Sequence, residues 1–377
     1  MRFSGFNSSR RAIVLAVLVW PLVGQGWEVK SFNGREHVSV PEIASFYGLG
    51  SEEQDQANSR TMKGAGREFS VQRDSRDVTI NGIRHWLAFP VVEDAGRLFI
   101  SRLDLGKTIE PAFRPVFIPD FPAVTTVVLD AGHGGKDRGA QSPYEWEKNF
   151  TLDVARRVRD QLKKAGLRVL MTRNSDTFIE LPERASIASS LKNVIFVSIH
   201  FNAADWNRDA NGFEVFCVTP RGAPSTAYEQ TRVRDMVMEN GNEHDLHSFA
   251  LANTIYHAMH GKLEMTDRGV KRARFAVLRL AGVPSVLIEG GFLTNPADAR
   301  RVASKQWRDS YAAAITRGIL EYKKLAELKV PPREVAAYRN PGSSESAPRE
   351  VAVSATEPAR VPGVTLRKIP ETSPSLP

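Results

Sequence analysis

Runs of consecutive apolar residues alternate with helix-like stretches between about residue 124 and residue 328. Five of these runs have the length of strands, and they lie at residues 126–130, 167–172, 194–200, 213–218 and 285–289. Continuous apolar runs of this length are typical of strands that are buried on both faces. Their alternation with helices predicts an α/β fold in which a mostly parallel sheet is flanked by helices.

The clearest helical pattern covers residues 146–164. Its apolar residues recur at every fourth position and share the face turned toward the core, namely Phe150, Val154, Val158 and Leu162. Glu147 lies three residues before Phe150, so it falls on the same inward stripe. A carboxylate at a helix start can also act as a cap or interact with the helix dipole. A metal-binding role for Glu147 therefore requires other ligands that point to the same place.

Residues 27–120 have the pattern of a small α+β domain. A short helix is expected at residues 41–47, because proline stands at its first position and Gly48 follows its end. The Asn81-Gly82 pair between two alternating runs indicates a β-hairpin. The domain offers no cluster of catalytic residue types and resembles, on pattern alone, the stalk-like domain at the N-terminus of copper amine oxidases.

Proline-rich stretches divide the rest of the chain. Four prolines between residues 108 and 124 predict a linker, so the second domain is placed at residues 121–328. Residues 329–377 are rich in proline and repeat the string PREVA. Such a segment cannot bury enough apolar surface to fold, and it is predicted to be a disordered tail.

The N-terminus has the features of an export signal. Arg2, Arg10 and Arg11 precede an apolar run at residues 12–23, which is short for a membrane span. Residues 1–26 are therefore interpreted as a signal peptide, with an uncleaved anchor as the alternative and a twin-arginine signal as a weaker variant. The rest of the chain has no run of ~18 apolar residues, which excludes a multi-span membrane protein.

The composition of the chain limits the kinds of molecule that we expect it to bind. The chain of 377 residues carries a formal net charge of +8, which favours polyanions such as anionic wall polymers. The charges are scattered and do not form a stripe interleaved with aromatic residues, so nucleic acid is not expected as a partner. Cys217 is the only cysteine, which excludes an internal disulfide, and its apolar surroundings favour a buried strand residue.

Residues that can carry chemistry follow or end several of the predicted strands. His133 follows the first strand within a glycine-rich turn, His200 ends the strand at residues 194–200, and Glu289 ends the strand at residues 285–289. In open α/β sheets, ligands bind in the crevice outside the carboxyl ends of the strands. We therefore expect these side chains and the inward Glu147 to meet there.

Two histidines and one glutamate form the ligand set of a catalytic zinc site, because they leave the fourth position open for water. Zinc lowers the pKa of such a water to about 7. A general acid/base must then move the proton, and Glu289 is the candidate on the neighbouring strand end. Glu145 is the alternative to Glu147 as the ligand at the helix start, but it lacks the position on the apolar stripe.

The predicted second domain resembles a known family, the zinc-dependent N-acetylmuramoyl-L-alanine amidases with two histidines and one glutamate as ligands. The matching strings lie in the family's order at residues 127–140, 147–155, 172–188, 196–203, 267–279 and 284–295. The resemblance implies that His133, Glu147 and His200 bind zinc and that Glu289 is the catalytic acid/base. It also implies hydrolysis of the amide bond between N-acetylmuramic acid and L-alanine in peptidoglycan, by an exported enzyme of the periplasm or cell envelope.

Some residues of the chain allow more than one interpretation. The chain has Ala131 where the family often has proline, and Gly290 where it usually has a bulkier residue. Arg268 could bind a substrate carboxylate or be a solvated charge, and Asn202 could bind substrate or brace His200. Residues 219–248 contain His244 and His247 and are interpreted as a surface loop or gating helix in preference to a second zinc site.

Alternative functions share parts of this pattern. Another zinc amide hydrolase of the cell wall, such as a carboxypeptidase or a deacetylase, would use the same metal on a different bond. A non-catalytic wall-binding protein would typically lack one of the four site residues. Contact with an activator or a wall polymer through residues 27–120 is a further possibility.

Overall fold

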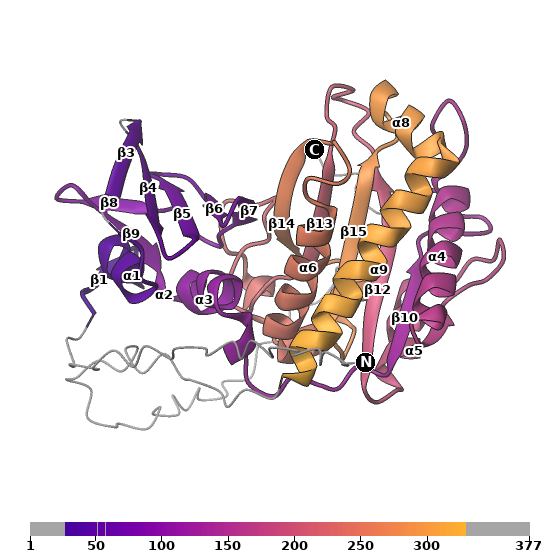
Figure 1. Cartoon of the computed structure of the whole chain (residues 1–377), viewed down its shortest axis with the longest axis horizontal. Helices are drawn as coiled ribbons and strands as arrows, with labels where there is room; N and C mark the ends of the chain where they lie inside the picture. Colours follow the sequence, from indigo (N-terminus) through magenta and orange to yellow (C-terminus); the bar gives the residue numbers. More distant parts are fainter. Residues whose placement is uncertain (1–26, 51, 57, 329–377) are drawn as a thin grey trace, which may run out of the picture.

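The computed structural model describes residues 27–50, 52–56 and 58–328. The predicted signal peptide at residues 1–26 and the predicted tail at residues 329–377 lie outside the described residues. Within them, a small N-terminal unit of mainly antiparallel strands is joined to a larger α/β part (Figure 1). The predicted α/β class with a preceding α+β unit is confirmed.

The larger part is built on a sheet whose strands come from the predicted apolar runs. In spatial order these are β11 (Arg168–Met171), β10 (Thr126–Ala131), β12 (Val194–Asn202), β15 (Ser285–Phe292), β13 (Phe213–Val218) and β14 (Asp267–Ala273). Neighbours from β11 to β15 are parallel, β13 is antiparallel to β15, and β14 is parallel to β13. The carboxyl ends of β10, β12 and β15 therefore lie beside the amino ends of β13 and β14, and we call this the carboxyl end of the sheet.

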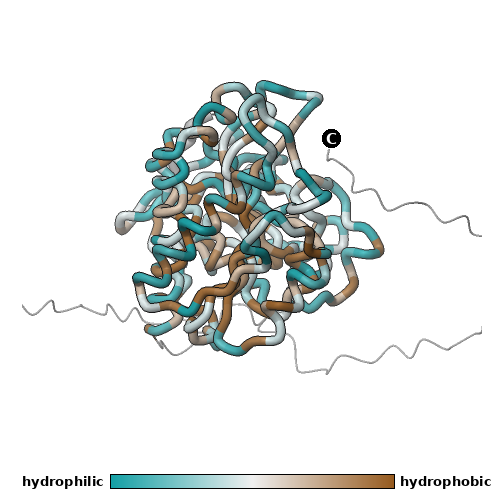
Figure 2. The backbone as a smooth tube through the Cα atoms, turned by 90° about the vertical axis from the view of Figure 1, so that its right-hand side faces the viewer, coloured by the Kyte–Doolittle hydropathy of each residue, from teal (hydrophilic) through white to brown (hydrophobic). Residues whose placement is uncertain are grey.

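Helices cover the two faces of the sheet unequally. One face is covered by α4 (Glu147–Lys164), α6 (Asp245–Met259) and α9 (Lys305–Glu327), with α8 (Pro296–Ala303) beside α9 (Figure 1). The other face carries the shorter α5 (Leu181–Ser189) and α7 (Ala276–Arg279). Consecutive residues Val127, Val128 and Leu129 are all fully buried because they pack alternately into these two layers. The hydrophobic stretches accordingly gather in the interior (Figure 2).

The N-terminal unit contains two groups of strands. One is the antiparallel sheet β1 (Val29–Phe32), β2 (Arg35–Ser39), β9 (Arg97–Ser101) and β8 (Val92–Asp94), next to α1 (Val40–Phe46). The other is the meander β3 (Glu52–Gln56), β4 (Ser59–Gly64), β5 (Arg67–Gln72), β6 (Asp77–Ile80) and β7 (Ile83–Trp86). The Asn81-Gly82 hairpin joins β6 to β7 as expected. His85 of β7 pairs with Val270 of β14, so the meander extends the large sheet.

The segment predicted as a linker contributes to the core. After α2 (Arg102–Asp104) the chain forms η1 (Leu105–Ile109), α3 (Glu110–Phe113) and η2 (Pro115–Phe117). Ile109, Phe113 and Ile118 are buried there. The prolines that suggested a linker include Pro111 and Pro115, which stand in the first turns of α3 and η2, where proline is tolerated.

The segment between β13 and α6 lies away from the carboxyl end of the sheet. It contains η3 (Val233–Met236) and η4 (Asn240–His244). Because β13 is antiparallel to β15, its last residue Val218 lies near the beginning of β15, and the segment follows from there. The structure thus favours the surface-loop interpretation of residues 219–248. Among the described residues, no helix is both long and apolar enough to cross a membrane.

Candidate active site

Two buried arginines hold the turn that leaves β10. Arg184 of α5 donates to Asp130 Oδ1 at 2.8 Å and to the carbonyl oxygen of His133 at 2.8 Å. Arg173 donates to the carbonyl oxygens of Ala131 and Gly132, both at 2.8 Å. Burial would raise the pKa of Asp130, but the Arg184 charge and hydroxyl donors keep it below its usual value. The ionised pair fixes the path of the backbone that carries His133.

The histidines approach each other over a glycine. A Cβ atom at Gly132 would lie 2.3 Å from Cε1 of His200, so any other residue at this position would displace the His200 ring. His133 itself adopts a φ of 60°, a strained left-handed conformation for a residue with a side chain. The arginine contacts to this turn stabilise that conformation. As a result the two rings lie 4.9 Å apart, centroid to centroid.

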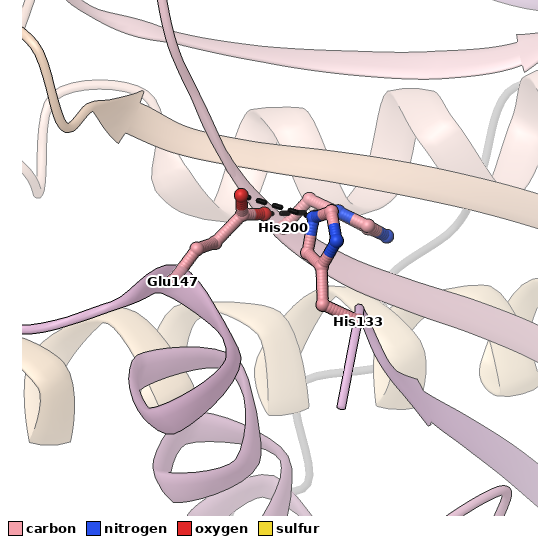
Figure 3. Close-up of side chains that lie close together, drawn as sticks. All are labelled: His133, Glu147 and His200. Carbon is pink, nitrogen blue, oxygen red and sulfur yellow. Dashed lines mark hydrogen bonds and ion pairs between the residues drawn. The ribbon is translucent and has the colours of Figure 1, made fainter. Parts of the chain in front are cut away.

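Glu147 stands at the first position of α4 and joins the two histidines (Figure 3). Its Oε2 lies 3.0 Å from Nε2 of His133, and its Oε1 lies 3.0 Å from Nδ1 of His200. The backbone N–H groups of Ala140 and Phe201 donate to the same carboxylate at 2.9 and 3.1 Å. The inward position expected from the apolar stripe is therefore the observed one, and Glu145 is exposed.

These residues fit a metal ion. One ligand atom from each of His133, Glu147 and His200 lies within 4.8 Å of the others, and among the described residues this is the group that could hold a metal. Two imidazole nitrogens and a carboxylate oxygen suit Zn²⁺ and leave one position open. His133 Nδ1 also lies 2.9 Å from Asp137 Oδ1, a contact that orients the ring.

The charges of the cluster are strongly coupled. Burial would lower the pKa of His133, but hydrogen bonds to Asp137 and Glu147 outweigh it and raise this pKa to about 10. Burial would raise the pKa of Glu147, yet both histidines hold it far below its usual range. The protein alone thus stabilises the ionised form of Glu147, as a bound cation would also do.

Glu289 lies beside the cluster on β15. It is the ladder partner of His200 on β12 and of Glu214 on β13. Burial raises its pKa well above the usual value, and the charges of Glu147 and Glu214 raise it further. Its Oε2 is shielded from solvent and has no hydrogen-bond partner among the described residues. This carboxyl group is free to exchange a proton with a bound molecule.

Glu214 is a residue of the site that the sequence analysis missed. Its carboxylate accepts from Asn202 Nδ2 at 2.8 Å, from Arg268 Nε at 2.9 Å and from Lys271 Nζ at 2.5 Å. The structure thus brings together Arg268 and Asn202, the two predicted substrate-contact residues. The available signal was a charged residue inside the otherwise apolar run at residues 213–218.

The remaining sequence features are structural. Gly290 allows Tyr311 of α9 to pack closely, because a Cβ at Gly290 would lie 2.6 Å from the tyrosine hydroxyl. His247 makes a 2.9 Å hydrogen bond with the carbonyl oxygen of Pro119, and its ring lies 6.0 Å from that of His244. Cys217 is buried in β13 as expected.

The fold and the site together have the form of a metal-dependent hydrolase: an α/β sheet gathers two histidines and two glutamates at its carboxyl end. The sequence profile of the N-acetylmuramoyl-L-alanine amidase family, Amidase_3, matches residues 127–321, and the chain belongs to this family. The resemblance described from the sequence motifs is confirmed.

Individual relatives match the same part of the chain. Uncharacterized protein YqiI of Bacillus subtilis is 35% identical over 197 residues, which are 52% of this chain and 84% of that protein. N-acetylmuramoyl-L-alanine amidase AmiC of Neisseria meningitidis is 35% identical over 225 residues, 54% of each chain. The amidase LytC of Bacillus subtilis is 34% identical, but the match covers only 35% of its length.

Solved structures of amidases also align with the chain. AmiC2 of Nostoc punctiforme is 34% identical, with 53% of this chain and 97% of that chain covered and a TM-score of 0.44. The catalytic domain of CwlV from Bacillus (Paenibacillus) polymyxa var. colistinus is 32% identical, with 54% and 99% covered and a TM-score of 0.45.

Proposed function

We propose that this protein hydrolyses the amide bond between N-acetylmuramic acid and L-alanine in peptidoglycan, with zinc held by His133, Glu147 and His200. The observation that carries the proposal is the convergence of these three ligand atoms within 4.8 Å, next to the buried carboxyl group of Glu289. Membership of the amidase family supports the choice of bond.

When bound, zinc supplies a Lewis acid that polarises the carbonyl group and makes water acidic near neutral pH. A carboxylate oxygen of Glu289 accepts a proton from the attacking water, and Glu289 then donates this proton to the leaving amide nitrogen. A C–O bond forms, the C–N bond breaks, and the products are the lactyl carboxylate and the amino group of L-alanine. The raised pKa of Glu289 suits this exchange, because a carboxyl group of higher pKa is both a better base and able to reprotonate.

We also propose that the enzyme is exported and acts at the cell envelope. The cell-wall substrate of its named relatives supports this location, and the pattern at residues 1–26 provides the signal. In this proposal residues 121–328 perform the chemistry, and residues 27–120 form an accessory unit that contacts a wall polymer or an activator. Residues 329–377 serve as a tail.

The proposal is tested on the mature chain, residues 27–377, loaded with zinc and given soluble muropeptides. Mass spectrometry of the products should show free N-acetylmuramic acid carboxylate and free L-alanine amino groups. Release of D-alanine would indicate a carboxypeptidase, and release of acetate would indicate a deacetylase. Binding to wall without any product would support a non-catalytic wall protein.

A further inference from the structure

A row of charged side chains crosses the sheet next to the metal cluster. His200, Glu289 and Glu214 are ladder partners on the adjacent strands β12, β15 and β13, so they share one face of the sheet. On the next strand, β14, Arg268 lies beside Glu214, between the pairs Phe213–Asp267 and Val215–Val270. Neighbouring strands are about 4.8 Å apart, which places the Arg268 backbone about 10 Å from that of Glu289.

The far end of this row has more positive than negative charge. One carboxylate, Glu214, accepts from two cations, Arg268 and Lys271. The nearby acids are engaged elsewhere: Asp267 accepts from the Tyr256 hydroxyl and the Gly269 N–H. Among the described residues, no ion pair joins Arg268 or Lys271 to Glu289. The cluster therefore has the charge to bind an additional carboxylate.

Contacts on several sides hold Arg268 in place, and its guanidinium still offers a donor. The Arg268 guanidinium lies 4.8 Å from the centroid of the Phe292 ring, and the Trp86 indole donates to the Arg268 carbonyl oxygen at 3.1 Å. Arg268 uses Nε toward Glu214 and Nη1 toward the Asn211 carbonyl oxygen at 3.4 Å. Its side chain is 31% exposed, and Nη2 has no hydrogen bond among the described residues. A ligand carboxylate can approach this free side of the guanidinium.

We propose that Arg268 and Lys271, positioned by Glu214, bind a free carboxylate on the second residue of the peptide stem and so select non-amidated stems. This inference rests on the proposed function. An extended chain advances about 3.5 Å per residue, so the second stem residue lies about 7 Å from the scissile bond. That is within reach of long side chains about 10 Å along the row from Glu289. A γ-linked glutamate presents such a carboxylate at its α position, and its amide does not.

The test compares two soluble substrates, N-acetylmuramoyl-L-alanyl-γ-D-glutamate and its α-amide, on the zinc-loaded mature chain. We expect kcat/KM to be about 10-fold to 100-fold higher for the free acid, chiefly through KM, because a charge-assisted hydrogen bond contributes that much. In Arg268→Gln the ratio of the two kcat/KM values should fall toward one. Arg317→Gln, an exposed charge change on α9, should keep the wild-type ratio.

Equal kcat/KM values for both substrates in the wild-type chain would overturn this inference and leave the proposed function intact. Cleavage of neither substrate by a zinc-loaded, folded chain would contradict the proposed function itself. If Arg268→Gln does not fold, Lys271→Gln gives the same readout. A full preference for the free acid retained in a folded Lys271→Gln chain would also overturn the assignment.

Discussion

Glu289 faces Glu214 directly across the antiparallel pair of β15 and β13, and the two residues are ladder partners. Glu214 is neutralised by Arg268 and Lys271, whereas Glu289 has an unpaired, shielded Oε2. The two carboxyl groups lie on neighbouring strands and thus have different environments. The difference supports the proposal that Glu214 is a structural charge and that Glu289 is the residue that transfers the proton.

Replacing Glu289 by glutamine should therefore remove the chemistry and leave the metal. We expect Glu289→Gln to lose about 10²-fold or more in kcat while its zinc content stays at one ion per chain. Metal analysis and single-turnover rates provide the measurement. Glu145→Gln, a matched change at an exposed carboxylate, should behave as wild type. Zinc loss in Glu289→Gln with residual chemistry would exchange the roles of Glu289 and Glu147.

Zinc removal should abolish activity without unfolding the chain. The ligands stand on elements whose core is already packed, unlike those of a zinc finger, which folds only with its metal. After chelation and dialysis, circular dichroism should be unchanged and turnover should return with added Zn²⁺. His133→Ala and Glu147→Ala should not regain turnover. Hydrolysis that survives exhaustive chelation would be incompatible with a zinc enzyme.

The buried pair of Asp130 and Arg184 should be essential for stability and for the shape of the metal site. Arg184→Met leaves a buried carboxylate uncompensated, which costs about 3–5 kcal/mol in the free energy of unfolding. It also releases the His133 carbonyl oxygen, so zinc affinity should fall. Chemical denaturation and zinc titration measure the two effects.

Matched control variants distinguish the loss of the Asp130–Arg184 ion pair from the loss of a positive charge elsewhere. Arg300→Met, at an exposed position, should change stability by no more than about 0.5 kcal/mol. The double variant Asp130→Asn/Arg184→Met should lose less than the two single variants added together, because no unpaired charge remains. Additive losses would mean that the ion pair does not couple the two residues.

Much of this site could be predicted because its residues stand at the ends of local patterns. The apolar runs ended at His200 and Glu289, and the helical stripe turned Glu147 inward. Glu214 and Lys271 were missed because both point from strand interiors onto one face, and only the pairing of β13 with β14 and β15 brings their neighbours together.

The contact between the two parts of the chain also depends on long-range pairing. The single ladder pair of His85 with Val270 gives no local sequence signal. Pro111 and Pro115 were misinterpreted for the opposite reason: their local signal was strong, but proline in the first turn of a helix has the same appearance in the sequence.

Because His85 lies at the contact between the two parts of the chain, the stability of the protein should decrease in acid. Burial lowers its pKa to about 4, against 6.5 in the unfolded chain, although hydrogen bonds with Asn253 and the Ile83 carbonyl oxygen oppose the shift. Above pH 6.5 both states are neutral and nothing is lost. As pH falls from 6.5 to 4, the unfolded chain takes up a proton that the folded chain does not, so stability decreases by up to about 3 kcal/mol.

The measurement is the free energy of unfolding at a series of pH values for wild type and His85→Gln. Glutamine can still bond to Asn253 but does not titrate, so the stability of the variant should decline less steeply toward pH 4. Identical slopes for the two chains would place the acid sensitivity elsewhere.

The N-terminal unit contacts the carboxyl end of the sheet through Trp86. Lys271 Nζ lies 5.6 Å from the centroid of the Trp86 ring, and the same indole donates to the Arg268 carbonyl oxygen. Residues 27–120 contain fourteen acidic and twelve basic side chains, so attraction to an anionic polymer cannot come from the net charge of this unit.

The Trp86 contacts can be tested by substitution. Trp86→Ala should raise KM for soluble muropeptides several-fold with little change in kcat, because it loosens Arg268 and Lys271 without touching the metal cluster. Phe46→Ala, at an exposed aromatic residue of the same unit, should leave both constants unchanged. Wild-type constants for a folded Trp86→Ala chain, combined with slower digestion of insoluble wall, would show that the unit only places the enzyme on its substrate.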